Sequence, residues 1–409
     1  FIFSSQRILK QELIMAKKVL SIVVPAFNEE DAIKSTIERM LEARGNIIRE
    51  TDIDEVELIV VNDGSSDNTA KITGEFASSG EVQLLSFEKN RGYGAAIKEG
   101  FSRAKGDYLG FFDADGTCDP NFFIKLYNVL KKEDAQISVG SRMHKDSSMP
   151  LVRTIGNSLY VRLINLLWRT RITDSASGMR LLDRKVLEEV YPLPDGLHFT
   201  PVMTCKALSC DGLKIVEIPM PYKERKGRSK LNVAKDGYRF LMTILELGFS
   251  YRPFAFFGTI GVFFIVVAAF YSVSVISHYA RYRSISDEMI YRIIAVVAAV
   301  VVGSILFFVN LIMQDFIACI KNKKLTFEKS GNGALRRMTN PRNIILCGVV
   351  FLALSLAIGA GSLFEYIATG KISQHWIYTM ACAFLLIEGT IIFIFGIAQN
   401  IIHVYKNKI

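Results

Sequence analysis

Hydrophobic residues are distributed unevenly along the chain, and in its first part they form short alternating elements. Between Val19 and Gly140, short apolar runs alternate with segments in which apolar side chains recur every three or four residues. The short runs predict buried strands at 20–25, 58–61, 82–87, 108–112 and 137–139. The periodic segments predict helices near 31–44, 68–77, 95–104 and 121–132. This alternation indicates an α/β domain with a mostly parallel sheet covered on both faces.

The C-terminal part has a different pattern, with long apolar runs. Runs without a charge lie at 254–277, 293–313 and 344–364, and a fourth run at 376–402 contains Glu388 as its single charged residue. Each is long enough for the roughly 20 helical residues that cross a bilayer core. The sequence therefore predicts four transmembrane helices. Because a charge is costly inside a membrane, we expect Glu388 to form an interhelical hydrogen bond rather than to act as a functional acid.

The loops between these runs predict their orientation. The connection at 321–342 holds seven basic residues and one acid, Glu328, whereas the next connection has Lys371 as its only basic residue. Basic loops remain on the cytoplasmic side of a membrane. We therefore expect an integral membrane protein whose N-terminal domain and Lys406/Lys408 tail face the cytoplasm.

Composition excludes several classes of protein. The 409-residue chain is 50% hydrophobic and 22% charged, unlike a disordered polymer or a typical soluble enzyme. Its net charge of +9 is dispersed over loops beside the membrane and lacks an aromatic-lined groove, so no nucleic-acid partner is expected. The six cysteines form no CxxC pair and the five histidines no HExxH motif. Neither a zinc site nor a disulfide framework is indicated.

Two amphipathic segments connect the two parts. At 151–172, leucine and isoleucine recur at helical spacing while arginines and Trp168 fill other positions, which is typical of a helix lying in a membrane interface. An amphipathic helix packed on the sheet is the alternative. The stretch 231–247 is similar and leads into the first apolar run. The predicted organisation is a leader or cloning remnant at 1–15, an α/β domain with its interfacial helix at 16–230, a juxtamembrane helix at 231–252 and a membrane domain at 253–409.

Polar residues follow the first two predicted strands. Pro25 to Glu30 comes after the first, and the second is followed by Asn62-Asp63-Gly64-Ser65-Ser66-Asp67, in which Ser66 or Asp67 can cap the next helix. Capping does not account for Asp63. Ligands bind at the carboxyl ends of the strands in such sheets. Two acidic loops at successive strand ends therefore favour a polar ligand such as a nucleoside.

The fourth strand ends in a pair of carboxylates, Asp113 and Asp115. Both can reach one divalent cation, and their hard oxygen ligands favour Mg²⁺ or Mn²⁺ bridging a diphosphate. A turn rich in Asp and Gly is the alternative. Gly92-Tyr93-Gly94 is not a dinucleotide-binding turn, because Ile97 stands where a third glycine is needed. The helix start there, with Arg91, could still help to hold a phosphate.

Together these residues resemble the glycosyltransferase family 2 pattern, and the whole chain resembles a polyprenyl-phosphate glycosyltransferase of the dolichol-phosphate mannose synthase type. The resemblance covers roughly 19–247 and implies a GT-A fold with a nucleotide-diphosphate sugar over the strand ends. By motif, it implies nucleoside contacts at Pro25, Glu29 and Asp63, and a metal at Asp113 and Asp115, with Asp113 also contacting the donor. Arg91 is a further candidate donor contact because it stands at a helix start. Where the family often has Gln as a further ligand, this chain has Thr117, which is the candidate third ligand.

The resemblance also implies an acceptor site. Arg142 in Gly-Ser-Arg, with Ser177 and Arg180 in Ser-Gly-Met-Arg, resemble the family segments that bind the lipid phosphate. Arginine suits this task because its planar fork matches phosphate oxygens. The stretch 225–232 resembles a mobile loop of the family, from which Lys230 could reach a donor phosphate. A solvated basic loop touching headgroups is the alternative.

The reaction that these features predict is metal-dependent transfer of one hexose, with inversion, to dolichyl or undecaprenyl phosphate. The acceptor is already anionic at neutral pH, so no strong general base is needed. GDP-mannose is the leading donor, with UDP-glucose or another UDP-hexose close behind, and homo-oligomerisation is left open. A processive polysaccharide synthase is a rival, although the chain has no Gln-x-x-Arg-Trp motif and no spans before the α/β domain. A non-catalytic membrane scaffold is the second rival.

Overall fold

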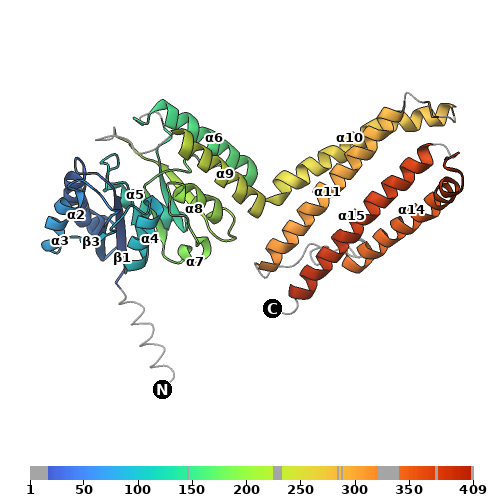
Figure 1. Ribbon diagram of the computed structural model, residues 1–409. Helices are drawn as coiled ribbons and strands as arrows, with labels where there is room; N and C mark the ends of the chain where they lie inside the picture. Colours follow the sequence, from blue (N-terminus) through green and yellow to red (C-terminus); the bar gives the residue numbers. More distant parts are fainter. Residues whose placement is uncertain are drawn as a thin grey trace, which may run out of the picture. The chain divides into compact units, whose positions relative to one another are not determined.

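The computed structural model describes residues 17–144, 147–223, 233–282, 285–286, 289–320, 340–373 and 376–406. The chain divides into two compact units, residues 1–247 and 248–409, which are described separately (Figure 1). The loop carrying Lys230, the basic connection at 321–339 and residues 1–16 lie outside the described residues. The predictions that depend on them remain predictions.

The first unit is built on one mixed sheet, which has seven strands within the described residues. The strands are β1 (Val19–Ala26), β2 (Glu55–Asn62), β3 (Gln83–Ser86), β4 (Tyr108–Phe111), β5 (Ile137–Ser141), β6 (Arg180–Asp183) and β7 (Ile215–Pro219), in the order β3-β2-β1-β4-β6-β5-β7. β6 runs antiparallel to β4 and β5, and the other neighbouring pairs are parallel. The predicted mostly parallel α/β sheet is confirmed. β6 and β7 were not predicted.

Helices cover both faces of this sheet because alternate side chains of its strands point to opposite sides. The helices that pack on the sheet are α2 (Ile33–Glu50), α3 (Thr69–Ser78), α4 (Tyr93–Arg103), α5 (Phe122–Lys132), α7 (Val186–Val190) and α8 (Phe199–Ala207). On β1, Leu20 and Ile22 join the core beneath α2 and α5, whereas Val23 joins the core beneath α4 and α8. The parallel order brings the ends of β1, β2 and β4 together at one edge.

Helix α6 (Leu151–Trp168) lies beside α9 (Val233–Tyr251) (Figure 1). The Tyr160 hydroxyl on α6 donates to the carbonyl oxygen of Gly237 at 2.9 Å, and the Tyr160 ring meets that of Phe240 edge-on at 5.9 Å. The predicted helix at 151–172 ends earlier because Arg169 adopts a left-handed conformation, with φ of 53°. The contacts of Tyr160 show that α6 and α9 pack against each other.

The second unit contains helices long and apolar enough to cross a membrane. Within the described residues there are four such spans, Phe254–Tyr282, Ile290–Ile320, Pro341–Thr369 and Trp376–Lys406. The first consists of the π-helical turn η1 (Phe254–Gly258) and α10 (Thr259–Tyr282), and the others are α11, α14 and α15. The four predicted transmembrane runs all fall within these helices.

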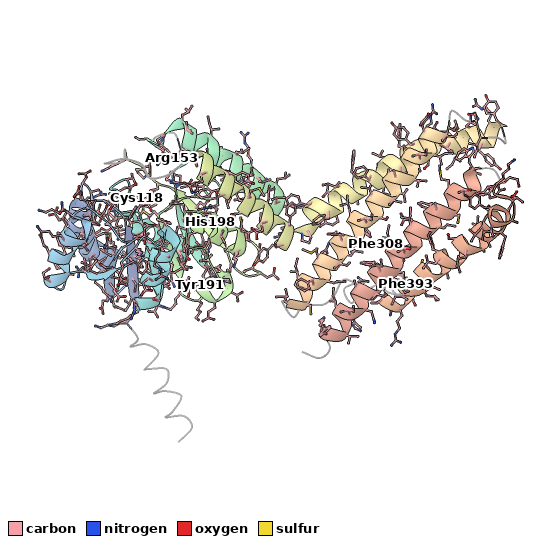
Figure 2. The ribbon with its side chains drawn as sticks, in the orientation of Figure 1. Cys118, Arg153, Tyr191, His198, Phe308 and Phe393 are labelled. Carbon is pink, nitrogen blue, oxygen red and sulfur yellow. The ribbon has the colours of Figure 1, made fainter. Side chains whose placement is uncertain are left out.

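Polar and aromatic contacts join α11 to α15. The Ser304 hydroxyl on α11 donates to Glu388 on α15 at 2.9 Å, so the predicted interhelical hydrogen bond of Glu388 is confirmed. The Gln399 amide of α15 donates to the buried Asp315 at 2.7 Å. Phe308, labelled on α11 in Figure 2, stacks on Phe395 with ring centroids 4.4 Å apart.

Candidate active site

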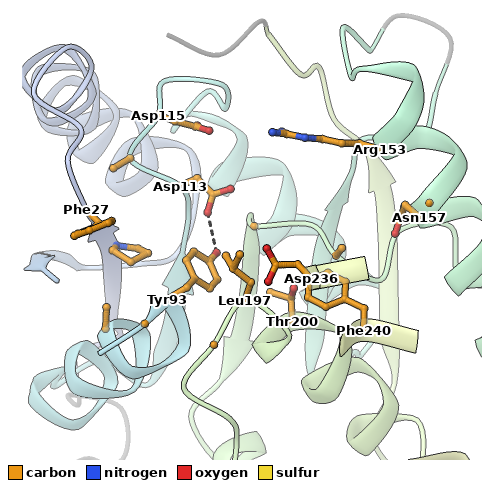
Figure 3. Close-up of a pocket in the computed structure, with 18 of the residues that line it drawn as sticks. Phe27, Tyr93, Asp113, Asp115, Arg153, Asn157, Leu197, Thr200, Asp236 and Phe240 are labelled. Atoms are coloured by element: carbon orange, nitrogen blue, oxygen red, sulfur yellow. Dashed lines mark hydrogen bonds between the residues drawn. The ribbon is translucent and has the colours of Figure 1, made fainter. Parts of the chain in front are cut away.

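A cavity of about 460 Å³ opens at the carboxyl ends of β1, β2 and β4, and all its walls belong to the first unit (Figure 3). Its floor comes from the loops after these strands, and its opposite wall comes from α6 and α9. The polar residues that line it are Glu29, Asp63, Asn90, Tyr93, Asp113, Asp115, Arg142, Arg153, Asn157, Tyr160, Thr200, Tyr222, Asp236 and Arg239.

The two predicted metal-binding carboxylates both line this cavity. The Tyr93 hydroxyl donates to Asp113 Oδ1 at 2.8 Å (Figure 3). Asp115 Oδ1 accepts from the backbone N–H of Thr117 at 3.2 Å and from its hydroxyl at 2.7 Å. Thr117 is fully buried and does not line the cavity. In this structure the Thr117 hydroxyl orients Asp115, and a role for Thr117 as a third metal ligand remains a prediction.

The donor set at Asp113 and Asp115 suits a cation that also binds a ligand. The described residues contain no group of three or more His, Cys, Asp or Glu side chains that could hold a metal ion. A pair of carboxylates fits Mg²⁺ or Mn²⁺ that takes its other ligands from water and substrate phosphates, as Mg²⁺ usually does. The residues present therefore fit a divalent cation bound together with a diphosphate.

Asp63 lies at the end of β2 and is almost fully buried. Its carboxylate accepts from the backbone N–H groups of Arg91 and Gly92 at 2.7 and 2.9 Å, and from the Asn90 amide at 3.0 Å. Burial raises the pKa of Asp63, and the two backbone N–H groups oppose this rise. Asp63 thus fixes the chain ahead of α4 while it lines the cavity with Pro25 and Glu29.

Several backbone N–H groups at the start of α4, where the sequence suggested a phosphate contact, already have partners within the protein. The N–H groups of Arg91 and Gly92 are bound to Asp63, and that of Ala95 donates to the carbonyl oxygen of Asp195 at 3.1 Å. The Arg91 guanidinium lies over the Phe87 ring, 4.5 Å from its centroid, and does not line the cavity. Arg91 thus lies away from the cavity in this structure, and its phosphate-binding role remains a prediction.

Arg142 lies in the cavity wall, where Asp174 holds it in a bidentate ion pair. Its Nε and Nη2 donate to the Asp174 carboxylate at 2.8 and 2.9 Å, and its backbone N–H donates at 3.0 Å. Burial opposes the charge of Arg142, but the adjacent Asp174 raises the pKa of the guanidinium above its usual value. Burial likewise opposes the charge of Asp174, and Arg142 lowers the pKa of that carboxyl overall. Arg142 therefore stays charged at the cavity surface.

Arg180 and Ser177 do not reach the cavity. Arg180 is fully buried, and its guanidinium donates to the carbonyl oxygens of Ser177 and Ser175 at 3.1 and 2.7 Å and to the Thr204 hydroxyl at 2.8 Å. Burial lowers the pKa of Arg180 to about 10. The Ser177 hydroxyl donates to the carbonyl oxygen of Gly140 at 2.6 Å. The structure thus places both residues in the interior, and their role at the acceptor phosphate remains a prediction.

One comparison with known proteins matches part of the chain to a family. Residues 21–191 match the sequence profile of glycosyltransferase family 2. This segment is similar to the glycosyltransferase domains of that family. The match spans β1 to β6 and includes all the acidic residues after β1, β2 and β4. The predicted fold class is confirmed as a mostly parallel α/β domain followed in the sequence by four apolar helices.

Curated proteins are similar to about half of the chain. The chain is 31% identical over 233 residues to the low-salt glycan biosynthesis hexosyltransferase Agl6 of Haloferax volcanii, a similarity that covers 55% of this chain and 53% of that protein. It is 28% identical over 247 residues to the dolichyl-phosphate beta-glucosyltransferase of Dictyostelium discoideum, covering 57% of this chain and 74% of that protein. The chain thus spans about half the length of the first relative.

One solved structure is similar to part of the chain. Glucosyl-3-phosphoglycerate synthase from Mycobacterium tuberculosis, crystallised with Mn²⁺, UDP and glucosyl-3-phosphoglycerate, aligns with a TM-score of 0.46 at 22% identity. The alignment covers 58% of this chain and 82% of that chain.

Several polar residues line the cavity without having been predicted, among them Arg153, Asn157 and Asp236. Arg153 and Asn157, one helical turn apart on α6, face the cavity, and Asp236 on α9 approaches it from the same side (Figure 3). Asn157 also donates to Asp174 at 3.1 Å. The signal in the sequence was the four-residue spacing of Arg153 and Asn157, which puts both on one helix face. The arginines of this helix were interpreted only as the polar positions of a helix in a membrane interface.

Proposed function

We propose that this protein transfers one hexose from a nucleotide-diphosphate sugar to a polyprenyl phosphate at the cytoplasmic surface of a membrane. The observation that carries the proposal is that one cavity is lined by the Asp113/Asp115 pair and by the guanidinium groups of Arg142 and Arg153. The donor diphosphate would pair with a cation held by Asp113 and Asp115, and the acceptor phosphate would pair with the two arginines. Two anionic reactants can then approach each other without strong repulsion.

The donor would lie over the strand ends. Pro25, Glu29 and Asp63 line the part of the cavity next to β1 and β2, where a nucleoside fits. Asp113 and Asp115 would hold Mg²⁺ or Mn²⁺ beside the diphosphate. Bound there, the cation would neutralise the charge that develops on the leaving diphosphate. The relative from Dictyostelium, named for dolichyl phosphate and glucose, supports a polyprenyl-phosphate acceptor and a hexose donor.

The acceptor phosphate would meet Arg142 and Arg153 on the opposite side. One charge pair at 4 Å in an effective dielectric near 20 is worth about 4 kcal/mol before desolvation, enough to position a phosphate. The phosphate oxygen is already anionic and attacks the anomeric carbon without a general base. Alignment opposite the leaving group inverts the anomeric carbon, so an α-linked donor gives a β-linked product.

The sugar itself would contact Asp236. This carboxylate is 8% exposed and lines the cavity together with Thr200. It would repel a phosphate but accept hydrogen bonds from the hydroxyl groups of a neutral hexose. A hydrogen bond to a charged group contributes about 1.5–3 kcal/mol, so Asp236→Asn is expected to lower kcat/KM about 10- to 150-fold. UDP or GDP affinity, measured by calorimetry, should remain unchanged.

The matched control for this change is Asp134→Asn, an exposed position in the loop after α5. It should leave both kcat/KM and nucleotide affinity at the wild-type value. If Asp236→Asn weakened nucleotide binding as much as it lowered turnover, the carboxylate would not be acting on the sugar.

Helix α6 would carry the cavity to the lipid surface. Its outer face exposes large apolar side chains at helical spacing, with exposed fractions of 58–75% at Leu151, Ile155, Leu159 and Leu166. Such a face is typical of a helix in a membrane interface. We propose that residues 231–252 then continue this interface into the membrane domain at 253–409, with the α/β domain at 16–230 on the cytoplasmic side.

The apolar face of α6 gives a second prediction. The double variant Ile155→Glu/Leu159→Glu is expected to raise the KM for a long, membrane-embedded polyprenyl phosphate at least tenfold, because burial of each side chain contributes about 1.5–3 kcal/mol. The KM for a short, water-soluble isoprenyl phosphate should not change. Ile48→Glu, at a half-exposed position on α2, is the control. Equal effects on both acceptors would mean that α6 does not bind the lipid surface.

The proposed function is tested with the purified protein in nanodiscs. It is incubated with Mn²⁺, a panel of nucleotide sugars and short or long polyprenyl phosphates, and the lipids are analysed by mass spectrometry. We expect one donor to give a lipid heavier by a single hexose. Products carrying several sugars would indicate a processive synthase, and the absence of any product across the panel would favour a scaffold.

A further inference from the structure

We infer that Gly178 and Tyr93 are positioning residues for Asp113, and that the buried Arg180 acts by fixing the segment that carries Gly178. The inference rests on the proposed function, because it gives Asp113 the role of a metal ligand. It also assigns a role to Arg180, which lies outside the cavity.

Gly178 touches the carboxylate of Asp113 directly. A Cβ atom added to Gly178 would lie 2.2 and 2.5 Å from the two carboxylate oxygens of Asp113 and 2.6 Å from its Cγ. The backbone of Gly178 is not in the left-handed region, so its conformation does not itself require glycine. The contact with Asp113 is therefore the reason why a larger residue does not fit.

Tyr93 fixes the same carboxylate through its hydroxyl, which donates to Asp113 Oδ1 at 2.8 Å. Tyr93 comes from α4 and Gly178 from the loop before β6, so two separate segments bracket Asp113. These two contacts limit the rotation of the Asp113 side chain, which must present its oxygens to a cation. Such supporting contacts are a usual requirement of metal ligands in proteins.

Arg180 holds the loop that presents Gly178. Its guanidinium binds the carbonyl oxygens of Ser175 and Ser177, and it is anchored to α8 through the Thr204 hydroxyl. The Ser177 hydroxyl ties the same loop to Gly140 of β5. The loop cannot retreat from Asp113 without breaking these hydrogen bonds.

The same loop begins at Asp174, which holds Arg142 in the cavity wall. One short segment, 174–178, therefore contacts both a proposed metal ligand and a proposed acceptor-binding arginine. Its rigidity sets the separation between the two charged groups across which the sugar would move.

The first test measures binding of Mn²⁺ to the full-length protein in the presence of UDP or GDP, from the electron paramagnetic resonance signal of the free ion. Gly178→Ala is expected to weaken Mn²⁺ binding about 10- to 100-fold, and Tyr93→Phe by a smaller factor. Gly74→Ala is the matched control, since a Cβ atom there meets nothing within 4 Å, and it should leave the affinity unchanged. Wild-type affinity in Gly178→Ala would overturn the inference.

The second test needs neither metal nor product. Gly178→Ala should lower the Tm by about 3 °C in the wild-type background. In the Asp113→Ala background it should lower the Tm far less, because the clash is with the Asp113 carboxylate. An equal loss in both backgrounds would overturn the inference. Failure to form a glycolipid would contradict the proposed function, but the comparison of Tm values in the two backgrounds would still test this inference.

Discussion

Replacement of Asp115 by asparagine is expected to lower glycolipid formation about 1000-fold. Asp115 is buried, lines the cavity and has its Oδ1 oriented by Thr117. A bound cation contributes several kcal/mol of charge stabilisation, and about 4 kcal/mol corresponds to three orders of magnitude in rate. The measurement is the initial rate of glycolipid formation at saturating donor, by mass spectrometry, together with Mn²⁺ affinity.

The chain provides a close control for this variant. Asp119 is four residues further along the same loop, is exposed and accepts from the backbone N–H of Asn121 at 3.0 Å. Asp119→Asn should retain a rate within a few-fold of the wild type. A fully active Asp115→Asn protein would remove the acidic pair from the proposed mechanism.

Removal of the Asp174 carboxylate is expected to destabilise the α/β domain by about 3–5 kcal/mol, the usual effect of leaving a buried charge without its partner. The Asp174 side chain has no exposed surface, and that of Arg142 is 12% exposed. Asp174→Ala should therefore lower the Tm of the detergent-purified protein by many degrees and abolish turnover. Glu133→Ala, which breaks the exposed pair with Lys214, is the control and should cost at most about 1 kcal/mol.

This pair also gives a pH dependence with a defined sign. The folded-state pKa of Asp174 is lowered, so its contribution to stability is complete above the unfolded-state pKa near 4. That contribution is lost as the pH falls through the folded-state pKa. The Tm of the wild type should thus fall more steeply below about pH 4 than that of Asp174→Asn. Parallel pH profiles would show that the Asp174 pKa is not lowered in the folded protein.

The acidic side of the site was predictable from the sequence because the short apolar runs show where the strands end. Asp63, Asp113 and Asp115 each follow a short apolar run, and the carboxyl ends of parallel strands share one edge. Where these side chains lie is therefore fixed by the order of the elements. The same reasoning could not show that the helix start at Arg91 is already occupied, because its partners come from distant loops.

The basic side was less predictable because a motif does not show which way a side chain points. Arg180 opens β6, a short antiparallel strand that the sequence pattern did not indicate, and in that strand it points into the interior. Arg153 was not predicted as a site residue because the sequence did not show that it faces the cavity. On α6 it shares a helix with exposed apolar residues, and the sequence alone did not separate the face toward the lipid from the face toward the cavity.

The most direct measurement of the central claim is the anomeric configuration of the lipid product. The protein in nanodiscs is supplied with an α-linked nucleotide hexose and polyprenyl phosphate, and the purified glycolipid is examined by NMR through its anomeric carbon–hydrogen and phosphorus couplings. The account predicts a single hexose joined to the lipid phosphate in β linkage. An α-linked product, or a sugar attached elsewhere than to the phosphate, would contradict it.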